Sequence, residues 1–134
     1  MGRQGLNAIL LDTHAWAWSL TGDAQLSEKA ISAMLAAESV FVSPISLFEI
    51  GQKVRIGKWP QMQPHVENLP ALLERQGGRV ASLTPQISLQ AAMMVWEHRD
   101  PFDRILAATA FDLGVPLISA DAVFDTMPGL NRVW

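Results

Sequence analysis

Short apolar runs alternate with longer amphipathic stretches along this chain, and this alternation restricts the fold more than any other feature. The runs at residues 7–11, 39–42, 79–83 and 116–119 are the candidate strands. Stretches that mix polar and apolar residues at helical spacing separate them. Strands that alternate with helices are typical of an α/β domain with a parallel sheet.

The helix candidates begin at recognisable positions. Proline fits the first helical position because it has no amide hydrogen to leave unpaired, and a preceding Ser, Thr or Asp can cap the helix. Ser27 precedes another helix candidate, and the stretch 65–76 is a further one that Gly77 and Gly78 end. The capping pairs with proline are Ser43-Pro44, Thr84-Pro85 and Asp100-Pro101.

Composition limits the class of protein. With 134 residues, 49% of them apolar and 17% charged, the chain suits a single globular domain over residues 1–134. It has no cysteine, which excludes disulfides, thiol catalysis and thiolate zinc sites and favours a reducing cytoplasm. No apolar run is long enough for a secretory signal or a membrane span, so we expect no membrane association.

The net charge of -3 gives no general attraction to nucleic acids, so any RNA contact must be local. Lys53, Arg55 and Lys58 form a basic cluster beside Trp59, which could stack on a base. The simpler interpretation of the cluster is a solvated helix end whose cations favour the negative pole of the helix.

Two acids follow apolar runs. Asp12 ends the first run and Asp121 follows the last one. Ligands of parallel α/β sheets bind at the carboxyl ends of strands, so both acids have a place suited to a site. A helix N-cap is an alternative for each, and for Asp12 alone it is the simpler one.

Glu49 lies on the same helical face as Ile45 and Ile56, where a buried, unpaired carboxylate would be costly. A metal ion or another partner would remove that cost. The alternative is an exposed i,i+4 ion pair with Lys53, worth about 0.2–0.5 kcal/mol. The residues leave both interpretations open.

Asp103 is the acid that a structural role explains least. Asp100 is a good N-cap for the helix that starts at Pro101, but Asp103 is a poorer capping-box partner than Glu or Gln. Asp103 also shares a helical stripe with the small residues Ala107 and Ala110, which would let another backbone come close.

In a parallel sheet, these four positions face the same carboxyl edge. Four carboxylates there would repel one another and raise each other's pKa unless a cation neutralised them. Oxygen ligands with open water positions suit Mg²⁺ or Mn²⁺. His14 and His98 lack the spacing of zinc ligands, although either could contact phosphate when protonated.

Four ordered blocks resemble the PIN-domain ribonucleases, and in particular the VapC-type toxins of toxin–antitoxin pairs. The blocks are Leu-Leu-Asp-Thr-His at 10–14, Ser-Pro-Ile-Ser-Leu-Phe-Glu-Ile at 43–50, Asp-Pro-Phe-Asp-Arg at 100–104 and Pro-Leu-Ile-Ser-Ala-Asp at 116–121. The resemblance implies a three-layer α/β/α fold around a central parallel sheet of four to five strands.

The resemblance also assigns roles to residues. It implies that the metal-binding and catalytic acids are Asp12, Glu49, Asp103 and Asp121. It implies that residues supporting the metal site or positioning the substrate are Thr13, Asp100, Arg104 and Ser119. His14, which could contact phosphate, is a further candidate for such a role. The candidate RNA-binding residues remain Lys53, Arg55, Lys58 and Trp59.

The implied activity is Mg²⁺- or Mn²⁺-dependent hydrolysis of RNA by a metal-activated water, which leaves 5′-phosphate and 3′-hydroxyl ends. Histidine catalysis through a 2′,3′-cyclic phosphate is the competing route. The implied partners are RNA, a cognate antitoxin and a second copy of the chain in a homodimer. A non-catalytic PIN-like module that binds RNA or protein is the alternative function.

Two other classes with acidic pockets fail on single residues. A response-regulator receiver domain needs a lysine after a late strand, and the last lysine here is Lys58. A haloacid-dehalogenase-like phosphatase would have a second aspartate two residues after Asp12, where this chain has His14.

Overall fold

The computed structural model describes residues 7–134, so residues 1–6 of the predicted single domain lie outside the described part. Its strands form one parallel sheet in the order β3-β2-β1-β4-β5, with β1 at the centre. This confirms the predicted α/β class and the sheet of four to five strands. The strands are β1 (Ala8–Leu11), β2 (Ser39–Val42), β3 (Arg79–Val80), β4 (Leu117–Ile118) and β5 (Arg132–Val133).

The helices begin where the capping residues predict. Ser27, Ser43, Thr84 and Asp100 each accept a backbone N–H at the start of a helix. The α-helices are α1 (Thr13–Thr21), α2 (Glu28–Ala36), α3 (Pro44–Arg55), α4 (Leu69–Arg75), α5 (Pro85–Met93) and α6 (Pro101–Leu113). The 3-10 helices are η1 (Pro60–Met62), η2 (Val66–Asn68) and η3 (Ala122–Thr126).

Some boundaries differ from the prediction. The expected strands at 79–83 and 116–119 pair over only two residues each, and the expected helix over 65–76 starts as the 3-10 helix η2. The α-helix α4 starts at Leu69, because Pro70 lacks an N–H and is tolerated only in the first turn of a helix. Strand β5 has two residues and carries no alternating pattern from which to predict it.

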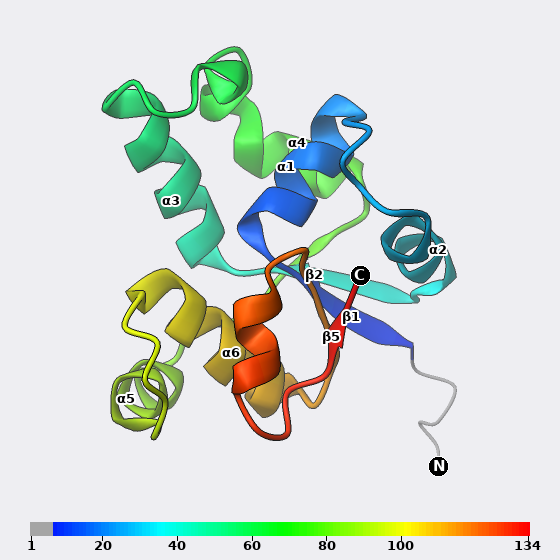
Figure 1. Cartoon of the computed structure of the whole chain (residues 1–134). Helices are drawn as coiled ribbons and strands as arrows, with labels where there is room; N and C mark the ends of the chain where they lie inside the picture. The colour runs from blue at the N-terminus through cyan, green and yellow to red at the C-terminus, as the bar shows by residue number, and fades with distance from the viewer. Residues whose placement is uncertain (1–6) are drawn as a thin grey trace.

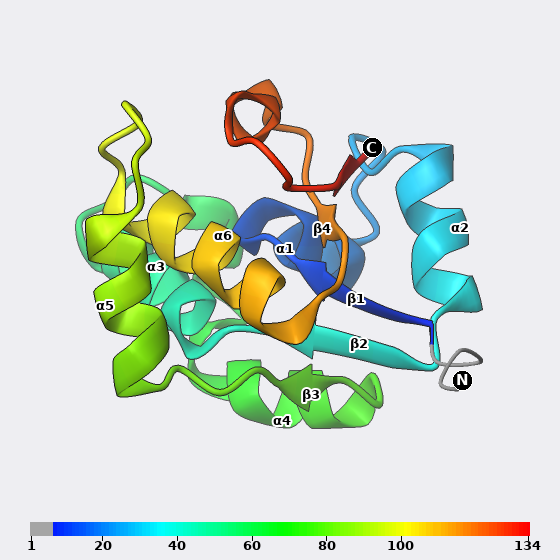
Figure 2. The same ribbon diagram turned by 90° about the horizontal axis from the view of Figure 1, so that it is seen from below.

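Side chains alternate between the two faces of the sheet. In β1, Ile9 and Leu11 join a core cluster with α1, α2 and α4, whereas Leu10 joins a cluster on the other face with α6. Helix α5 packs against α6 (Figure 2). The two clusters on opposite faces of one sheet give the predicted three layers.

The order of the strands determines where a site can form. The chain passes from β1 to β2 on one side and returns to pair β4 on the other, so the carboxyl ends of β1 and β4 lie at a topological switch point. Helices α1, α3 and α6 gather at this end of the sheet (Figure 1). Ala107 and Ala110 of α6 are buried in the cluster that contains Leu10 and Leu117, so the stripe that carries Asp103 faces the sheet.

No helix within residues 7–134 combines the length and the apolar character needed to cross a membrane.

Candidate active site

One pocket of about 200 Å³ brings the four predicted acids together. It also contains three of the predicted supporting residues and one residue of the basic cluster. Segments far apart in the sequence therefore meet at the carboxyl edge of the sheet. The lining residues are Asp12, Thr13, His14, Glu49, Lys53, Asp100, Asp103, Leu106 and Asp121.

Asp12 lies directly after β1 and caps α1. Its Oδ1 accepts a hydrogen bond from the Ala15 amide at 2.7 Å, and the residue is only 7% exposed. Burial raises the pKa of Asp12 to about 6, although a hydrogen bond from Ser119 acts in the opposite direction. The negative charge of Asp103 adds to the rise. Asp12 is thus a helix cap and a pocket residue at once.

Asp103 lies in the first turn of α6 and contacts a histidine. Its Oδ2 and the Nε2 of His98 are hydrogen-bonded at 2.7 Å. Burial raises the pKa of Asp103 above its usual value, the hydrogen bond with His98 lowers it, and the nearby charges of Asp100 and Asp121 raise it. Asp103 therefore has an environment that disfavours its negative charge.

Glu49 lies in the middle of α3, where it is 8% exposed and faces the pocket. Its Oε2 contacts the Nζ of Lys53 at 2.7 Å. Both interpretations of the sequence are therefore present together, because the carboxylate is buried and also forms the i,i+4 pair. The ammonium group of Lys53 therefore lies beside a carboxylate of the pocket.

The basic cluster divides around the pocket. Lys53 lines it, and its Nζ lies 5.6 Å from the centroid of the Trp59 ring. The Trp59 ring stacks on His14 with centroids 4.6 Å apart. Arg55 and Lys58 are exposed and do not line the pocket. Of the four candidate RNA-binding residues, the structure thus places Lys53 in the acidic pocket and Trp59 against two residues that line it.

Small hydroxyl groups connect the acidic segments. The Thr13 hydroxyl donates to the buried Ser46 at 2.9 Å, which joins α1 to α3. Ser119 Oγ accepts from the Asp121 amide at 3.0 Å, and the Asp121 carboxylate accepts from the Val123 amide at 3.0 Å. Ser119 therefore lies behind the acids and holds them in place. Ser46 was not predicted, although it lies one helical turn before Glu49.

Arg104 does not line the acidic pocket. Its guanidinium instead donates to backbone carbonyls at the end of α5 and in the segment that leads from α5 to α6. This position fits a role in holding that segment, rather than the contact with substrate that its place beside Asp103 suggests. The carbonyls belong to Ala91, Ala92, Met94, Trp96 and His98.

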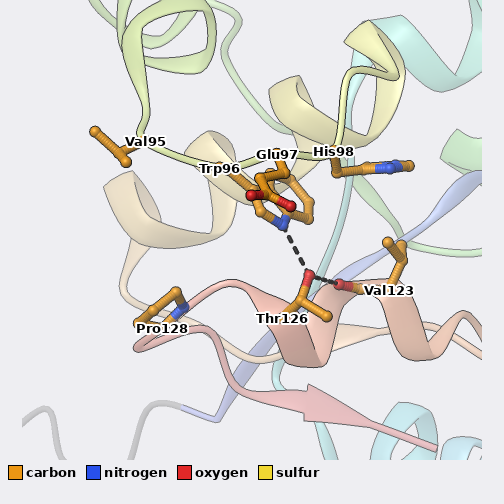
Figure 3. A pocket seen from close by; sticks show the side chains of 7 residues that line it. All are labelled: Val95, Trp96, Glu97, His98, Val123, Thr126 and Pro128. Atoms are coloured by element: carbon orange, nitrogen blue, oxygen red, sulfur yellow. Dashed lines mark hydrogen bonds between the residues drawn. The ribbon is translucent and has the colours of Figure 1, made fainter.

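A second cavity, of about 700 Å³, lies between this segment and η3 (Figure 3). Trp96 Nε1 donates to Thr126 Oγ1 at 2.8 Å, and Thr126 donates to the Val123 carbonyl at 2.6 Å. These bonds fasten the segment that carries His98 to the 3-10 helix that Asp121 caps. His98 lines this cavity and bonds Asp103, so it connects the cavity with the acidic pocket.

His98 is the site residue that the sequence did not place. The sequence indicated only that its side chain could contact phosphate when protonated. In the structure, ligand atoms of His98, Asp100 and Asp103 all lie within 4.8 Å of one another. Among the described residues, this trio is the group of acids and histidines whose donor atoms lie this close together, and it shares Asp103 with the four acids that line the pocket. The nearness of His98 to Asp100 in sequence was the available signal.

A parallel sheet with an acidic pocket at its switch point defines a class of α/β proteins. Comparison of the sequence with models of known families identifies the family. The family model described as PIN domain matches residues 9–130. The chain therefore belongs to the PIN domain family.

Among curated proteins, Ribonuclease VapC22 of Mycobacterium tuberculosis (strain ATCC 25618 / H37Rv) is similar to this chain. The two are 28% identical over 117 residues, which cover 87% of this chain and 88% of the relative.

Solved structures share the fold at lower identity. A toxin–antitoxin complex from Klebsiella pneumoniae matches with a TM-score of 0.60 at 16% identity, over 91% of this chain and 94% of that one. VapBC2 from Rickettsia felis, bound to a DNA fragment from its promoter, matches with a TM-score of 0.62 at 14% identity, over 93% and 96%. FitAcB from Neisseria gonorrhoeae matches with a TM-score of 0.55 at 20% identity, over 92% and 95%.

Proposed function

We propose that this protein is a metal-dependent endoribonuclease and the toxin of a type II toxin–antitoxin system. The observation that carries the proposal is the meeting of Asp12, Glu49, Asp103 and Asp121 in one pocket of a PIN domain. The similarity to a protein named as a VapC ribonuclease supports the same activity.

The donor chemistry of the pocket fits Mg²⁺ or Mn²⁺. Carboxylate oxygens are the ligands that these hard cations prefer. The raised pKa values of Asp12 and Asp103 show carboxylates whose charge is poorly compensated by protein groups alone, which a cation would correct. Asp12, Glu49, Asp103 and Asp121 would hold the ion. A bound divalent ion supplies an activated water and stabilises the charge that develops on the phosphate.

The chain's own residues prepare this chemistry. Ser119 fixes Asp12 and Asp121, and His98 orients Asp103. Lys53 is the cation nearest the acids in the described pocket, so its ammonium can exchange Glu49 for an RNA phosphate when substrate arrives. Because His98 is hydrogen-bonded to Asp103, we assign it the role of orienting that carboxylate and not the role of a free general base.

We propose the same partners that the sequence implied: RNA, a small antitoxin protein and a second copy of the chain, in the cytoplasm. The structural neighbours from Klebsiella and Rickettsia, a toxin–antitoxin complex and a VapBC assembly, support an antitoxin.

The test is cleavage of total cellular RNA by the purified protein with Mg²⁺ or Mn²⁺, with excess EDTA, and with the Asp103→Asn variant. We expect discrete cuts that EDTA and the variant abolish, with 5′-phosphate and 3′-hydroxyl ends. Asp125→Asn is the matched control, because Asp125 is exposed, pairs with Arg132 and lies outside the pocket. It should cleave like the wild type.

Other outcomes decide against the proposal. Ends with 2′,3′-cyclic phosphate, formed in EDTA, would show histidine catalysis instead of metal-assisted hydrolysis. RNA binding without any cleavage would favour the non-catalytic module.

A further inference from the structure

Another cleft begins at His14, where the acidic pocket ends. It encloses about 320 Å³ between α1 and the segment after α3, and His14 lines both spaces. We propose that this cleft binds an unpaired base of the RNA strand, the base next to the phosphodiester that lies at the acids. This inference rests on the proposed ribonuclease function and extends it to the part of the substrate that the protein holds.

Aromatic rings form the walls of the cleft. The rings of His14 and Trp59 stack with an interplanar angle of 26°, and Trp18 is tilted against His14 with centroids 5.6 Å apart. Trp18 and Trp59 are only partly buried, so part of each ring is open to the cleft. Proteins bind unpaired bases by stacking them on such rings.

Uncharged and acidic groups line the rest of the cleft. The amides of Gln25 and Gln61 can donate to and accept from a base edge. Asp23 Oδ1 accepts from the backbone N–H of Gln25 at 2.8 Å, while Oδ2 has only a 3.5 Å contact with the Gln25 side chain. Among the described lining residues there is no lysine or arginine, and Asp23 repels phosphate. The lining therefore suits a base and not the backbone of the RNA.

The position of the Lys53 ammonium group agrees with a separation between a site for the base and a site for the RNA backbone. Lys53 lines the acidic pocket and its Nζ lies 5.6 Å from the Trp59 ring, so it stands between the two spaces. A strand whose phosphate contacts Lys53 would present its neighbouring base to the rings of His14 and Trp59. The backbone would then follow the charge of Lys53, and the base would enter the aromatic cleft.

The test measures coupling between one side chain and one base. Fluorescein-labelled single-stranded RNAs of about ten nucleotides, with an abasic residue moved through each position, are titrated by fluorescence anisotropy against the Asp103→Asn protein in Mg²⁺. This background keeps the strands intact. We expect one abasic position to weaken binding about tenfold, the value typical of a lost base–aromatic stack. Adding Trp59→Ala should weaken binding of intact RNA by about tenfold and abolish the penalty at that position.

Control variants separate binding from folding, because Trp59 also packs against the core. Trp59→Phe should retain most of the abasic penalty. Gln61→Ala should reduce it, whereas Gln63→Ala should not, because both glutamines are exposed on the same segment and only Gln61 lines the cleft.

Equal abasic penalties in the parent, the Trp59→Ala and the Gln61→Ala proteins would overturn the base cleft, as would failure to bind any of these RNAs. The cleavage of total RNA by the wild type decides the proposed function separately. Metal-dependent cleavage without this coupling would refute base binding in the cleft and would still support the proposed nuclease activity.

Discussion

Carboxylates of the pocket form structural contacts within the protein and line the candidate site at the same time. Asp12 and Asp121 each use Oδ1 to cap a helix, which leaves the second oxygen for the pocket. Glu49 is buried and also paired with Lys53. The sequence presented cap and ligand, or pair and ligand, as alternatives, but a carboxylate has enough acceptor sites for both.

The residues whose placement could not be predicted act across folded segments. Arg104 follows Asp103 in sequence, yet its side chain turns to carbonyls of residues 91–98. His98 meets Asp103 only because that segment folds back over the start of α6. Contacts of this kind depend on the path of a loop, which carries no periodic signal.

Asp12 makes stability depend on pH in a definite direction. Its pKa in the folded protein is about 6, above the ordinary value of 3.8, so folding favours the protonated form. The stability that this provides is complete below about pH 4 and is lost as the pH rises through about 6. In EDTA, we expect the free energy of unfolding to fall by up to about 3 kcal/mol from this group between pH 4 and pH 7.

Asp12→Asn tests this effect, because asparagine keeps the cap without the charge. Urea unfolding in EDTA should show a smaller loss of stability with rising pH, and the variant should exceed the wild type by about 1–3 kcal/mol at pH 7. The variant should also lose RNA cleavage. The same decline with pH in both proteins would contradict the assignment.

Lys53 competes with a metal ion for Glu49. Removing its charge in Lys53→Met should strengthen Mg²⁺ binding several-fold, because both an ion-pair partner and a nearby positive charge are lost. The same change should weaken RNA binding. Isothermal titration calorimetry with Mg²⁺ measures the first effect, and Lys58→Met is the control, since Lys58 is exposed and outside the pocket. Unchanged Mg²⁺ affinity in Lys53→Met would show that the pair does not oppose the ion.

At the scale of elements, helix starts were predicted better than strand ends. A capping side chain such as Ser27 or Thr84 bonds an amide within three residues, so the signal is local. Strands β3 and β4 end where their neighbours stop pairing, which the sequence of one strand does not contain. Strand β5 is defined entirely by its pairing with β4.

The segment between α5 and α6 depends on Arg104. Arg104→Lys keeps the charge but loses the planar fork of donors, so it cannot satisfy the same set of carbonyls. We expect the free energy of unfolding to fall by at least about 2 kcal/mol, since hydrogen bonds to a charged group contribute about 1.5–3 kcal/mol each. Chemical denaturation measures it. Arg99→Lys, at an exposed position one residue before Asp100, should have little effect.

Equal stability of the Arg104→Lys and Arg99→Lys proteins would show that the guanidinium fork is not what holds the segment.

For the whole molecule, the sheet order explains why residues separated by more than a hundred positions share one pocket. With β1 central and β4 beside it, Asp12 and Asp121 follow adjacent parallel strands, and the middle of α3 and the start of α6 reach the same edge. The rule that carboxyl ends of parallel strands meet was enough to predict that Asp12 and Asp121 lie at one edge of the sheet. It was not enough for the aromatic cleft, whose far wall comes from the irregular segment after α3.

The central claim is that Asp12, Glu49, Asp103 and Asp121 together form one divalent metal site. The most direct measurement is anomalous diffraction from crystals of the wild-type protein grown with Mn²⁺. The account predicts an anomalous peak inside the acidic pocket, within coordination distance of carboxylates from both strand ends and both helices. A peak held only by His98, Asp100 and Asp103, or no peak at saturating Mn²⁺, would contradict it.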